Sequence, residues 1–395
     1  MRLLVTGAGG LIGSNLAASA AQQSWSVLGT WRGTPVSVLG ARTAQLDVAD
    51  RHACVTLAEE FEPDVIVHAA AESSPGCLER EPHLAELNLL GAENTLAAAR
   101  AVRARYVLVS CDLVFSGMRP SAECWEEEDP AQPINALGRS LLACERLAQQ
   151  FGGSWTITRP ADVYGVNLSI PAAPPPAASA SGGREQAGAV GGLGPAANGN
   201  GAGWAALAAR ARHVWERSGA PLRWVAWLRA GKPLAAPPGI RRSPTYAWDY
   251  AQCVCELIAQ ECEGTYNMAG PTILGRLAHL RLVARAFNCD VRLVQEGSPA
   301  AFLRASEGAP DGIEATPAAP VPMPANTALC DRKASFVLGR AAVDPFTGHR
   351  LMRRQLDQVL NPPTPPTCAD PHSPPLAPPV APIPPIPPIS VQALG

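Results

Sequence analysis

From Arg2 to Tyr164, short apolar runs alternate with stretches of helical periodicity. The apolar runs predict buried strands at Arg2–Thr6, Ser26–Thr30, Asp64–His68, Arg105–Ser110 and Trp155–Thr158. The stretches between them predict helices at Leu11–Gln22, Arg51–Glu60, Pro82–Val102 and Asn135–Phe151. Strands that alternate with helices in this way are typical of an α/β fold with a doubly wound parallel sheet.

The pattern changes in two low-complexity segments. Residues 171–203 are almost wholly Ala, Pro, Gly and Ser, so they lack the apolar side chains that would offset the entropy of ordering them. Residues 361–395 are proline-dense, which favours extended polyproline II over helix or sheet. We predict a disordered insertion and a disordered tail, and a further long loop at Ala305–Pro324.

Ordered sequence resumes between the insertion and the tail. Its pattern predicts helices at Trp204–Ser218, Trp248–Gln260 and Gly275–Phe287 and a strand at Gly264–Met268. We expect these elements to form a smaller C-terminal lobe that receives the substrate. The predicted organisation is therefore a first domain at 1–170, the insertion at 171–203, the lobe at 204–360 and the tail at 361–395.

Composition narrows the class of protein. The net charge of −2 over 395 residues, with 17% charged residues, provides no basic patch for nucleic acid. Eleven cysteines without CxxC pairs favour reduced thiols over a disulfide framework or a metal site. The chain opens on a predicted strand instead of a signal peptide, and no apolar run reaches the length of a membrane span. We expect a cytoplasmic protein that binds neither membrane nor nucleic acid.

A glycine-rich loop, TGAGGLIG at Thr6–Gly13, follows the first strand and opens the first helix. Gly7 permits a tight turn, Gly10 lets the backbone approach a pyrophosphate, and Gly13 lets the helix pack closely on the strand. The N–H groups of the helix N-terminus would then face the phosphates. The loop predicts a dinucleotide-binding Rossmann domain; a glycine turn without a ligand is the alternative.

The end of the second strand indicates which dinucleotide is bound. NAD-preferring sites usually have an Asp or Glu there, whereas this strand ends in Arg32, which can pair with a 2′-phosphate. The alternative is a solvated loop arginine. We predict NADP(H), with Asp47 near the adenine and the small residues after the strand at Asp64–His68 leaving room for the cofactor. The predicted cofactor contacts are Gly7, Gly9, Gly10, Leu11, Ile12, Gly13, Arg32, Asp47, Val48, Ala69, Ala70, Ala71, Ser110 and Val163, and no metal site is predicted.

The chain resembles the extended short-chain dehydrogenase/reductases. Within them it is similar to the RmlD-like branch that contains dTDP-4-dehydrorhamnose reductase and the regulatory β subunit of methionine adenosyltransferase. The resemblance lies in ordered segments at Thr6–Gly13, Asp64–Ala71, Glu79–Asn88, Val109–Gly117, Pro133–Glu145, Arg159–Gly165, Ser243–Tyr246, Gly264–Gly270 and Asn326–Gly339. Two further segments, Ala21–Trp25 and Val65–Pro82, are more similar to the β subunit than to the reductase.

The resemblance implies three catalytic groups near the nicotinamide. A Tyr donates the proton, a Lys four residues later assists it, and a Ser or Thr polarises the carbonyl. At the matching positions this chain has Leu137, Leu141 and Cys111. No Tyr anywhere in the chain is followed by Lys four positions on. No catalytic set is intact, although a rearranged site that uses Arg139, Ser110 or Asp112 is an alternative.

These observations favour an NADP(H)-binding pseudoenzyme. By resemblance it would be a regulatory subunit in S-adenosylmethionine synthesis, partnered by the catalytic subunit of methionine adenosyltransferase. The alternative is an active NADPH-dependent reductase of a nucleotide-linked sugar, which would bind a small nucleotide-linked ligand. A third hypothesis, recognition of the proline-rich tail by an SH3-like or WW-like partner, rests on composition alone.

Overall fold

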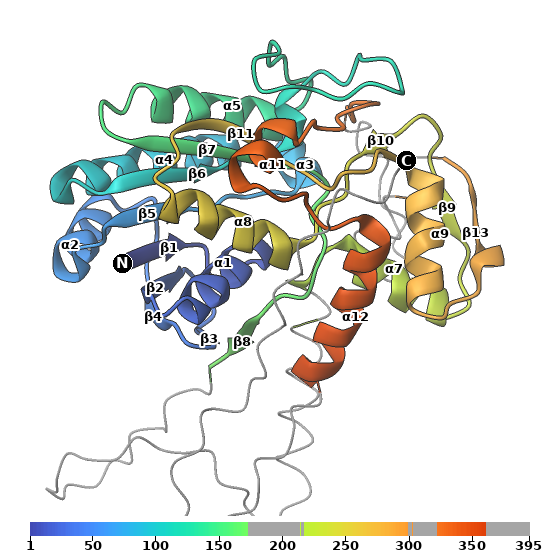
Figure 1. Ribbon diagram of the computed structural model, residues 1–395, viewed down its shortest axis with the longest axis horizontal. Coiled ribbons are helices and arrows are strands. Elements are labelled where there is room, and N and C mark those ends of the chain that lie inside the picture. The colour runs from blue at the N-terminus through green and yellow to red at the C-terminus, as the bar shows by residue number, and fades with distance from the viewer. Residues whose placement is uncertain (173–213, 215–216, 299–301, 303–321, 361–395) are drawn as a thin grey trace, which may run out of the picture.

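The computed structural model describes residues 1–172, 214, 217–298, 302 and 322–360. At its centre lies a seven-stranded sheet in the order β11-β7-β6-β5-β1-β2-β4 (Figure 1), and each recorded pairing in it is parallel. Its strands are β1 (Arg2–Thr6), β2 (Ser26–Trp31), β4 (Arg42–Gln45), β5 (Val65–His68), β6 (Arg105–Val109), β7 (Trp155–Pro160) and β11 (Gly264–Met268). The predicted fold class, a doubly wound parallel sheet, is confirmed.

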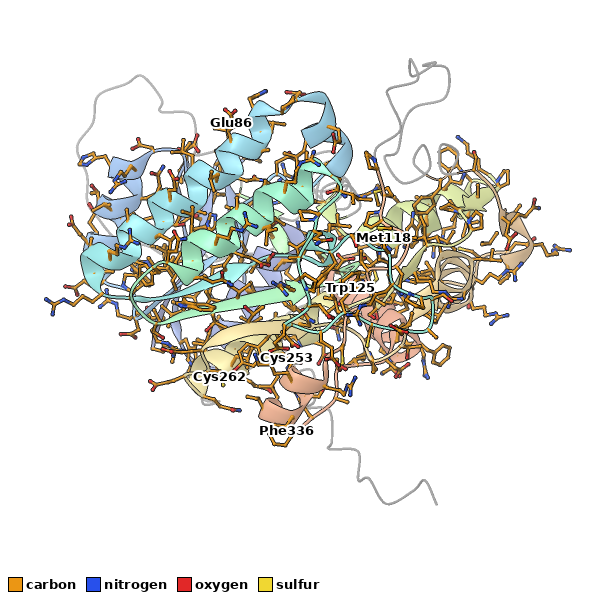
Figure 2. All side chains as sticks on the ribbon, turned by 90° about the horizontal axis from the view of Figure 1, so that it is seen from above. Glu86, Met118, Trp125, Cys253, Cys262 and Phe336 are labelled. Atoms are coloured by element: carbon orange, nitrogen blue, oxygen red, sulfur yellow. The ribbon has the colours of Figure 1, made fainter. Side chains whose placement is uncertain are left out.

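Helices cover both faces of this sheet. One face carries α1 (Leu11–Gln22) and α8 (Ala247–Ala259); the other carries α2 (Arg51–Phe61), α4 (His83–Val102) and α5 (Ala136–Gln149). In Figure 2, Glu86 on α4 and Phe336 on α11 (Arg332–Leu338) mark the two opposite faces. Side chains alternate between the faces, so Leu3 and Val5 join one buried cluster and Leu4 joins the other.

The sequence pattern places most of these elements to within two residues. The predicted bounds of β1, α1 and β11 match the observed ones. Helix α5 begins after Asn135, because the Asn135 side chain accepts a hydrogen bond from the Gly138 N–H and so caps the helix. Four short elements of the first part of the chain were given no bounds in the prediction, namely β3 (Val36–Val38), β4, α3 (Pro75–Arg80) and β8 (Ser169–Pro171), since runs of three to six residues carry little periodicity. The helices at 220–229, 332–338 and 345–360 were not predicted either.

The smaller part of the molecule, beside the sheet, is built from α7 (Ala220–Arg229), α9 (Arg276–Ala286), α12 (Pro345–Leu360) and short strands. The strands pair as β9 (Leu234–Ala236) with β13 (Val294–Glu296) and β10 (Arg241–Arg242) with β12 (Leu274–Gly275). Single-turn 3₁₀ helices lie at Asp112–Val114 and Val291–Leu293.

Two elements that we expected in the C-terminal lobe lie instead with the first domain. Strand β11 extends the main sheet by pairing with β7, from Gly264 opposite Thr156 to Met268 opposite Pro160, and α8 packs beside α1. The prediction was wrong on this point, because chain order does not show which sheet edge a strand joins. The boundaries of the four predicted parts stay a prediction.

Several predicted segments lie outside the described residues. They are most of the insertion at 171–203, the helix at Trp204–Ser218 apart from its last residues, most of the loop at Ala305–Pro324, and the tail at 361–395. Pro171, placed in the insertion by the sequence pattern, ends β8 and pairs with Val36. Among the helices that the structure describes, none has both the length and the apolar character needed to cross a membrane.

Candidate functional site

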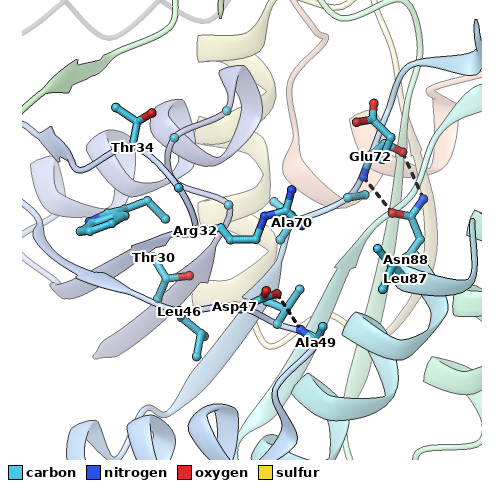
Figure 3. Close-up of a pocket in the computed structure, with 18 of the residues that line it drawn as sticks. Thr30, Arg32, Thr34, Leu46, Asp47, Ala49, Ala70, Glu72, Leu87 and Asn88 are labelled. Atoms are coloured by element: carbon cyan, nitrogen blue, oxygen red, sulfur yellow. Dashed lines mark hydrogen bonds between the residues drawn. The ribbon is translucent and has the colours of Figure 1, made fainter. Parts of the chain in front are cut away.

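A cavity of about 450 Å³ lies at the carboxyl ends of β1, β2, β4 and β5 (Figure 3). This is the edge of an open parallel sheet at which α/β proteins bind ligands. Nine of the predicted cofactor contacts line it, namely Gly7, Gly9, Gly10, Arg32, Asp47, Val48, Ala69, Ala70 and Ala71. The fold therefore brings together residues from four separate strand ends.

Two positions of the glycine loop, Gly7 and Gly13, leave no room for a side chain. Gly7 has φ +75°, and a Cβ there would lie 2.8 Å from the carbonyl oxygen of Ala69. A Cβ on Gly13 would lie 2.3 Å from the carbonyl oxygen of Gly7, so the first turn of α1 packs directly on the loop. Gly10, the N-cap of α1, provides no side-chain cap, and the first turn holds no acidic residue. The N–H groups of this turn therefore remain able to bind an anion.

One wall of the cavity carries the polar residues that follow β2 and β4. Arg32 is exposed, and its side chain extends into the cavity beside Asp47 (Figure 3). Asp47 Oδ1 accepts a hydrogen bond from the Ala49 N–H at 3.0 Å. No ion pair of the Arg32 guanidinium with another residue of the described chain is recorded, so this cation is available to a ligand.

The small residues after β5 are fixed by a buried threonine. Thr6 Oγ1 accepts hydrogen bonds from the Ala69 N–H at 3.2 Å and the Ala70 N–H at 3.3 Å, and lies 2.9 Å from His68 Nδ1. With two donors already directed at it, Thr6 Oγ1 donates its own hydrogen to Nδ1. Burial lowers the pKa of His68 to about 4, so the ring stays neutral and can accept it.

Eleven lining residues are absent from the predicted set, namely Thr30, Trp31, Gly33, Thr34, Leu46, Ala49, Glu72, Leu84, Leu87, Asn88 and Arg217. Seven of them lie within two residues of a predicted contact in the sequence, which is a signal that could have found them. Asn88 lies farther from the predicted contacts in the sequence and is held at the cavity by two hydrogen bonds to Glu72. Its Oδ1 accepts from the Glu72 N–H at 2.8 Å and its Nδ2 donates to the Glu72 carbonyl at 3.1 Å (Figure 3). Arg217 has no local signal, because it is brought in from far along the chain.

Five predicted contacts are not among the lining residues, namely Leu11, Ile12, Gly13, Ser110 and Val163. For Ser110 the contacts give a physical reason. The Ser110 hydroxyl donates to Glu145 Oε1 at 2.6 Å, and the Glu145 carboxylate also accepts two hydrogen bonds from Arg159, at 2.9 and 2.7 Å. All three side chains are buried, so this hydroxyl belongs to an interior network.

The three positions that correspond to the catalytic groups of the resembled family lie in an apolar environment. Leu137 and Leu141 are 4% and 6% exposed. They belong to one hydrophobic cluster with Leu113 and Phe115, and Cys111 packs against it. Burial raises the pKa of the Cys111 thiol well above its usual value, and the nearby Asp112 adds to this effect, so the sulfur stays protonated.

Two aspartate–arginine pairs adjoin this cluster, and the pKa values of their carboxyl groups are shifted in opposite directions. Burial raises the pKa of Asp112 to about 6, although Arg242, 3.5 Å away, and a hydrogen bond from the Thr327 hydroxyl oppose the rise. Burial also acts to raise the pKa of Asp162, but Arg276 at 2.8 Å and His279 at 3.2 Å outweigh it, and that pKa falls below its usual value. In the described residues no cluster of three or more His, Cys, Asp or Glu side chains could hold a metal ion.

Comparison with known proteins identifies relatives of the first domain. Residues 1–169 match the family described as the RmlD substrate binding domain. The chain is 35% identical to methionine adenosyltransferase 2 subunit beta of Xenopus laevis over 165 residues, which is 42% of this chain and 47% of that protein. It is 33% identical to dTDP-4-dehydrorhamnose reductase of Burkholderia thailandensis over 165 residues, 42% of this chain and 51% of that one. The chain thus spans about half the length of the curated relatives it matches, and the predicted resemblance is confirmed over the first domain.

Solved structures extend the likeness of fold to the rest of the chain. A dTDP-4-dehydrorhamnose reductase from Bacillus anthracis, solved in complex with NADP, has a TM-score of 0.64 at 18% identity and covers 90% of this chain and 99% of its own. A UDP-glucose 4-epimerase from Thermus thermophilus, solved with NAD, has a TM-score of 0.64 at 22% identity, covering 92% and 100%. At these identities the comparison shows the fold.

Proposed function

We propose that the chain binds NADP(H) in the cavity at the carboxyl edge of the sheet, does not use it for hydride transfer, and acts as a regulatory subunit. By its similarity to methionine adenosyltransferase subunit β, it would associate in the cytoplasm with a methionine adenosyltransferase catalytic subunit and affect S-adenosylmethionine synthesis. A retained ligand of this kind adds stability to the folded chain by mass action, even without turnover.

The residues of the cavity fit such a cofactor. Its volume of about 450 Å³ lies within the ~300–1,000 Å³ usual for ligand sites. The glycine loop and the uncapped N-terminus of α1 suit a pyrophosphate, and Arg32, in place of a carboxylate after β2, suits a 2′-phosphate. When bound, the cofactor supplies a nicotinamide able to exchange hydride. The residues of this chain would bind and orient it.

The observation that carries the absence of catalysis is the burial of Leu137 and Leu141 in an apolar cluster. Reduction of a carbonyl needs a proton donor beside the reacting oxygen as hydride arrives. Neither leucine side chain has an acidic hydrogen to donate, and the Cys111 thiol is a weak hydrogen-bond donor. The polar neighbours are also engaged, because Ser110 donates to Glu145 and Asp112 is paired with Arg242 and Thr327.

Three measurements on the full chain test this proposal. We expect NADP⁺ to raise the melting temperature and to bind more tightly than NAD⁺. We expect no oxidation of NADPH with a dTDP-4-dehydro-sugar above the rate without protein. We expect a methionine adenosyltransferase catalytic subunit to co-purify with the chain and to change its kinetics when the chain is added. Failure of NADP⁺ to bind would reject the cofactor, and failure of the subunits to associate would reject the regulatory role.

The similarity to dTDP-4-dehydrorhamnose reductase supports a second candidate, an active NADPH-dependent reductase of a nucleotide-linked sugar. In that case a group other than the usual Tyr would donate the proton, and Asp112, which follows Cys111 and has a pKa of about 6, is the candidate. Turnover of NADPH with a dTDP-4-dehydro-sugar that is lost in Asp112→Asn would favour this reading over the regulatory one.

A further inference from the structure

The cavity contains a second arginine, Arg217, from a segment far along the chain. Arg217 precedes α7, yet it lines the same cavity as Gly9 and Gly10. Its guanidinium lies over the glycine loop, since a Cβ built on Gly9 would be 4.0 Å from Arg217 Nη1. Arg217 is exposed, and within the described chain no ion-pair partner is recorded for it. A cation at this place is available to an anion that rests on the loop.

A buried asparagine ties the backbone of Arg217 to the glycine loop. Asn167 is fully buried, and its Nδ2 donates both to the Gly9 carbonyl at 3.0 Å and to the Arg217 carbonyl at 3.3 Å. The Asn167 N–H donates to Ser218 Oγ at 2.8 Å. The hydroxyl of Ser169 donates to the same Gly9 carbonyl at 3.2 Å. One side chain thus sets the distance between the loop and the segment that carries Arg217.

A glycine on the other side of Arg217 lets this segment lie close to the sheet. A Cβ on Gly219 would be 3.1 Å from Tyr164 Cα and 3.1 Å from the Val163 carbonyl oxygen. Any larger residue would push the segment away from the end of β7, and with it Arg217 away from the loop. The backbone from Arg217 to Gly219 is therefore held at both ends while the Arg217 side chain remains free to meet a ligand.

The two arginines of the cavity stand where two different phosphates would lie. Arg32 follows β2, the place at which Rossmann proteins read the 2′-position of the adenosine ribose. Arg217 stands over the glycine loop and the N-terminus of α1, where the pyrophosphate is held. The 2′-phosphate is present only in NADP(H), whereas the pyrophosphate is common to NAD(H) and NADP(H).

We propose that Arg217 binds the pyrophosphate of the dinucleotide, and that Asn167 is a positioning residue that holds Arg217 over the glycine loop. This inference rests on the proposed binding of a dinucleotide and deepens it. The site is completed by a segment outside the predicted first domain, so the pyrophosphate contacts both the Rossmann sheet and the chain that leads into α7.

The test is a titration of full-length wild-type and Arg217→Gln protein with NADP⁺ and, separately, with NAD⁺. A hydrogen bond to a charged group predicts that Arg217→Gln weakens both dinucleotides by a similar factor, on the order of 10- to 100-fold. Arg32→Gln should weaken NADP⁺ by a comparable factor and leave NAD⁺ nearly unchanged. Arg281→Gln, the same charge change on the exposed face of α9, is the matched control and should alter neither affinity.

The outcomes separate this inference from the proposed function. If the wild-type protein binds neither dinucleotide, the proposed function fails. If it binds them and Arg217→Gln leaves both affinities unchanged, or lowers only that for NADP⁺, the role of Arg217 is overturned while cofactor binding stands. Melting temperatures without ligand show whether each variant is folded. Arg217→Lys should bind both dinucleotides more tightly than Arg217→Gln, and equal weakness in the two variants would contradict a charge contact.

A double-mutant cycle tests the positioning role of Asn167. If Asn167 acts through Arg217, the effect of Asn167→Ala on the Kd of NAD⁺ should shrink when Arg217 is already glutamine. Fully additive effects would overturn the positioning role. A purely structural role would lower the melting temperature and leave the Kd of the folded protein unchanged.

Discussion

The carboxyl edge of the main sheet presents two regions with opposite chemistry. Beyond β1, β2, β4 and β5 lies an open cavity that is lined by the glycine loop and by two arginines, Arg32 and Arg217. Beyond β6, at the start of α5, the positions that correspond to catalytic groups of the resembled family are occupied by Leu137 and Leu141, which are packed among apolar neighbours. Both regions are built on adjacent strands of the same sheet.

Under the proposed function, cofactor binding and catalysis would depend on different parts of the chain. The glycine loop presents backbone atoms to a dinucleotide, and replacing Gly7 or Gly13 would place a Cβ in collision with neighbouring backbone atoms. Proton transfer depends on a few side chains, which can change to leucine while the helix keeps its place. A chain of this kind can retain a cofactor after the catalytic groups are lost.

The largest expected effect comes from placing a charge in the apolar region. Leu141→Lys should destabilise the fold by about 4 kcal/mol, because a buried ammonium without a partner loses its hydration. Leu141→Met, the matched control, should cost less than about 1.5 kcal/mol. Urea titration measures both. A Leu141→Lys protein as stable as wild type would show that this face is not core and would weaken the case against catalysis.

The next effect concerns the glycine loop. Gly7→Ala combines a positive φ with a Cβ 2.8 Å from the Ala69 carbonyl, and should cost roughly 2–4 kcal/mol of stability and most of the NADP⁺ affinity. Gly152→Ala is the control, because Gly152 has a similar positive φ, nothing lies within 4 Å of its Cβ, and it is not among the residues that line the cavity. Thermal unfolding with and without NADP⁺ compares the two. Equal stability and equal NADP⁺ affinity of the two variants would mean that dinucleotide binding does not depend on the shape of this loop.

The third prediction is a dependence of stability on pH that arises outside the cavity. Burial raises the pKa of Asp112 from 3.8 to about 6, so its contribution to stability is full below about pH 4 and is lost as the pH rises through 6. Between pH 7 and pH 4 the stability of wild type relative to Asp112→Asn should therefore rise by about 2–3 kcal/mol. Urea titrations at several pH values measure this. A difference that is independent of pH would show that Asp112 keeps an ordinary pKa.

The smallest effect distinguishes Ser110 as an interior residue from Ser110 as a cofactor contact. Ser110→Ala removes the hydrogen bond to Glu145, which keeps its two bonds from Arg159, so the expected loss of stability is only about 1–2 kcal/mol. Because the hydroxyl is directed at Glu145, the affinity for NADP⁺ should not change. A clear loss of that affinity would restore Ser110 to the cofactor site.

Much of the first domain could be predicted without a structure, because its signals are local and periodic. The strand and helix pattern predicted the sheet, and the glycine spacing predicted the turn at Gly7 and the close packing at Gly13. The positions of Leu137 and Leu141 within a recognised segment led to the hypothesis that the chain lacks the catalytic Tyr and Lys of the resembled family. Each of these inferences needs only residues that are near one another in the chain.

Other features depend on contacts between distant residues, which no local pattern encodes. Strand β11 reads as a buried strand, but only its register with β7 places it at the edge of the main sheet. Ser110 reads as a polar residue near a site, but the position of Glu145 decides where its hydroxyl points. Arg217 reads as one arginine among many, and the hydrogen bonds of Asn167 bring it to the glycine loop. Residue type and periodicity therefore determine what each element is, whereas long-range packing determines which side chains meet.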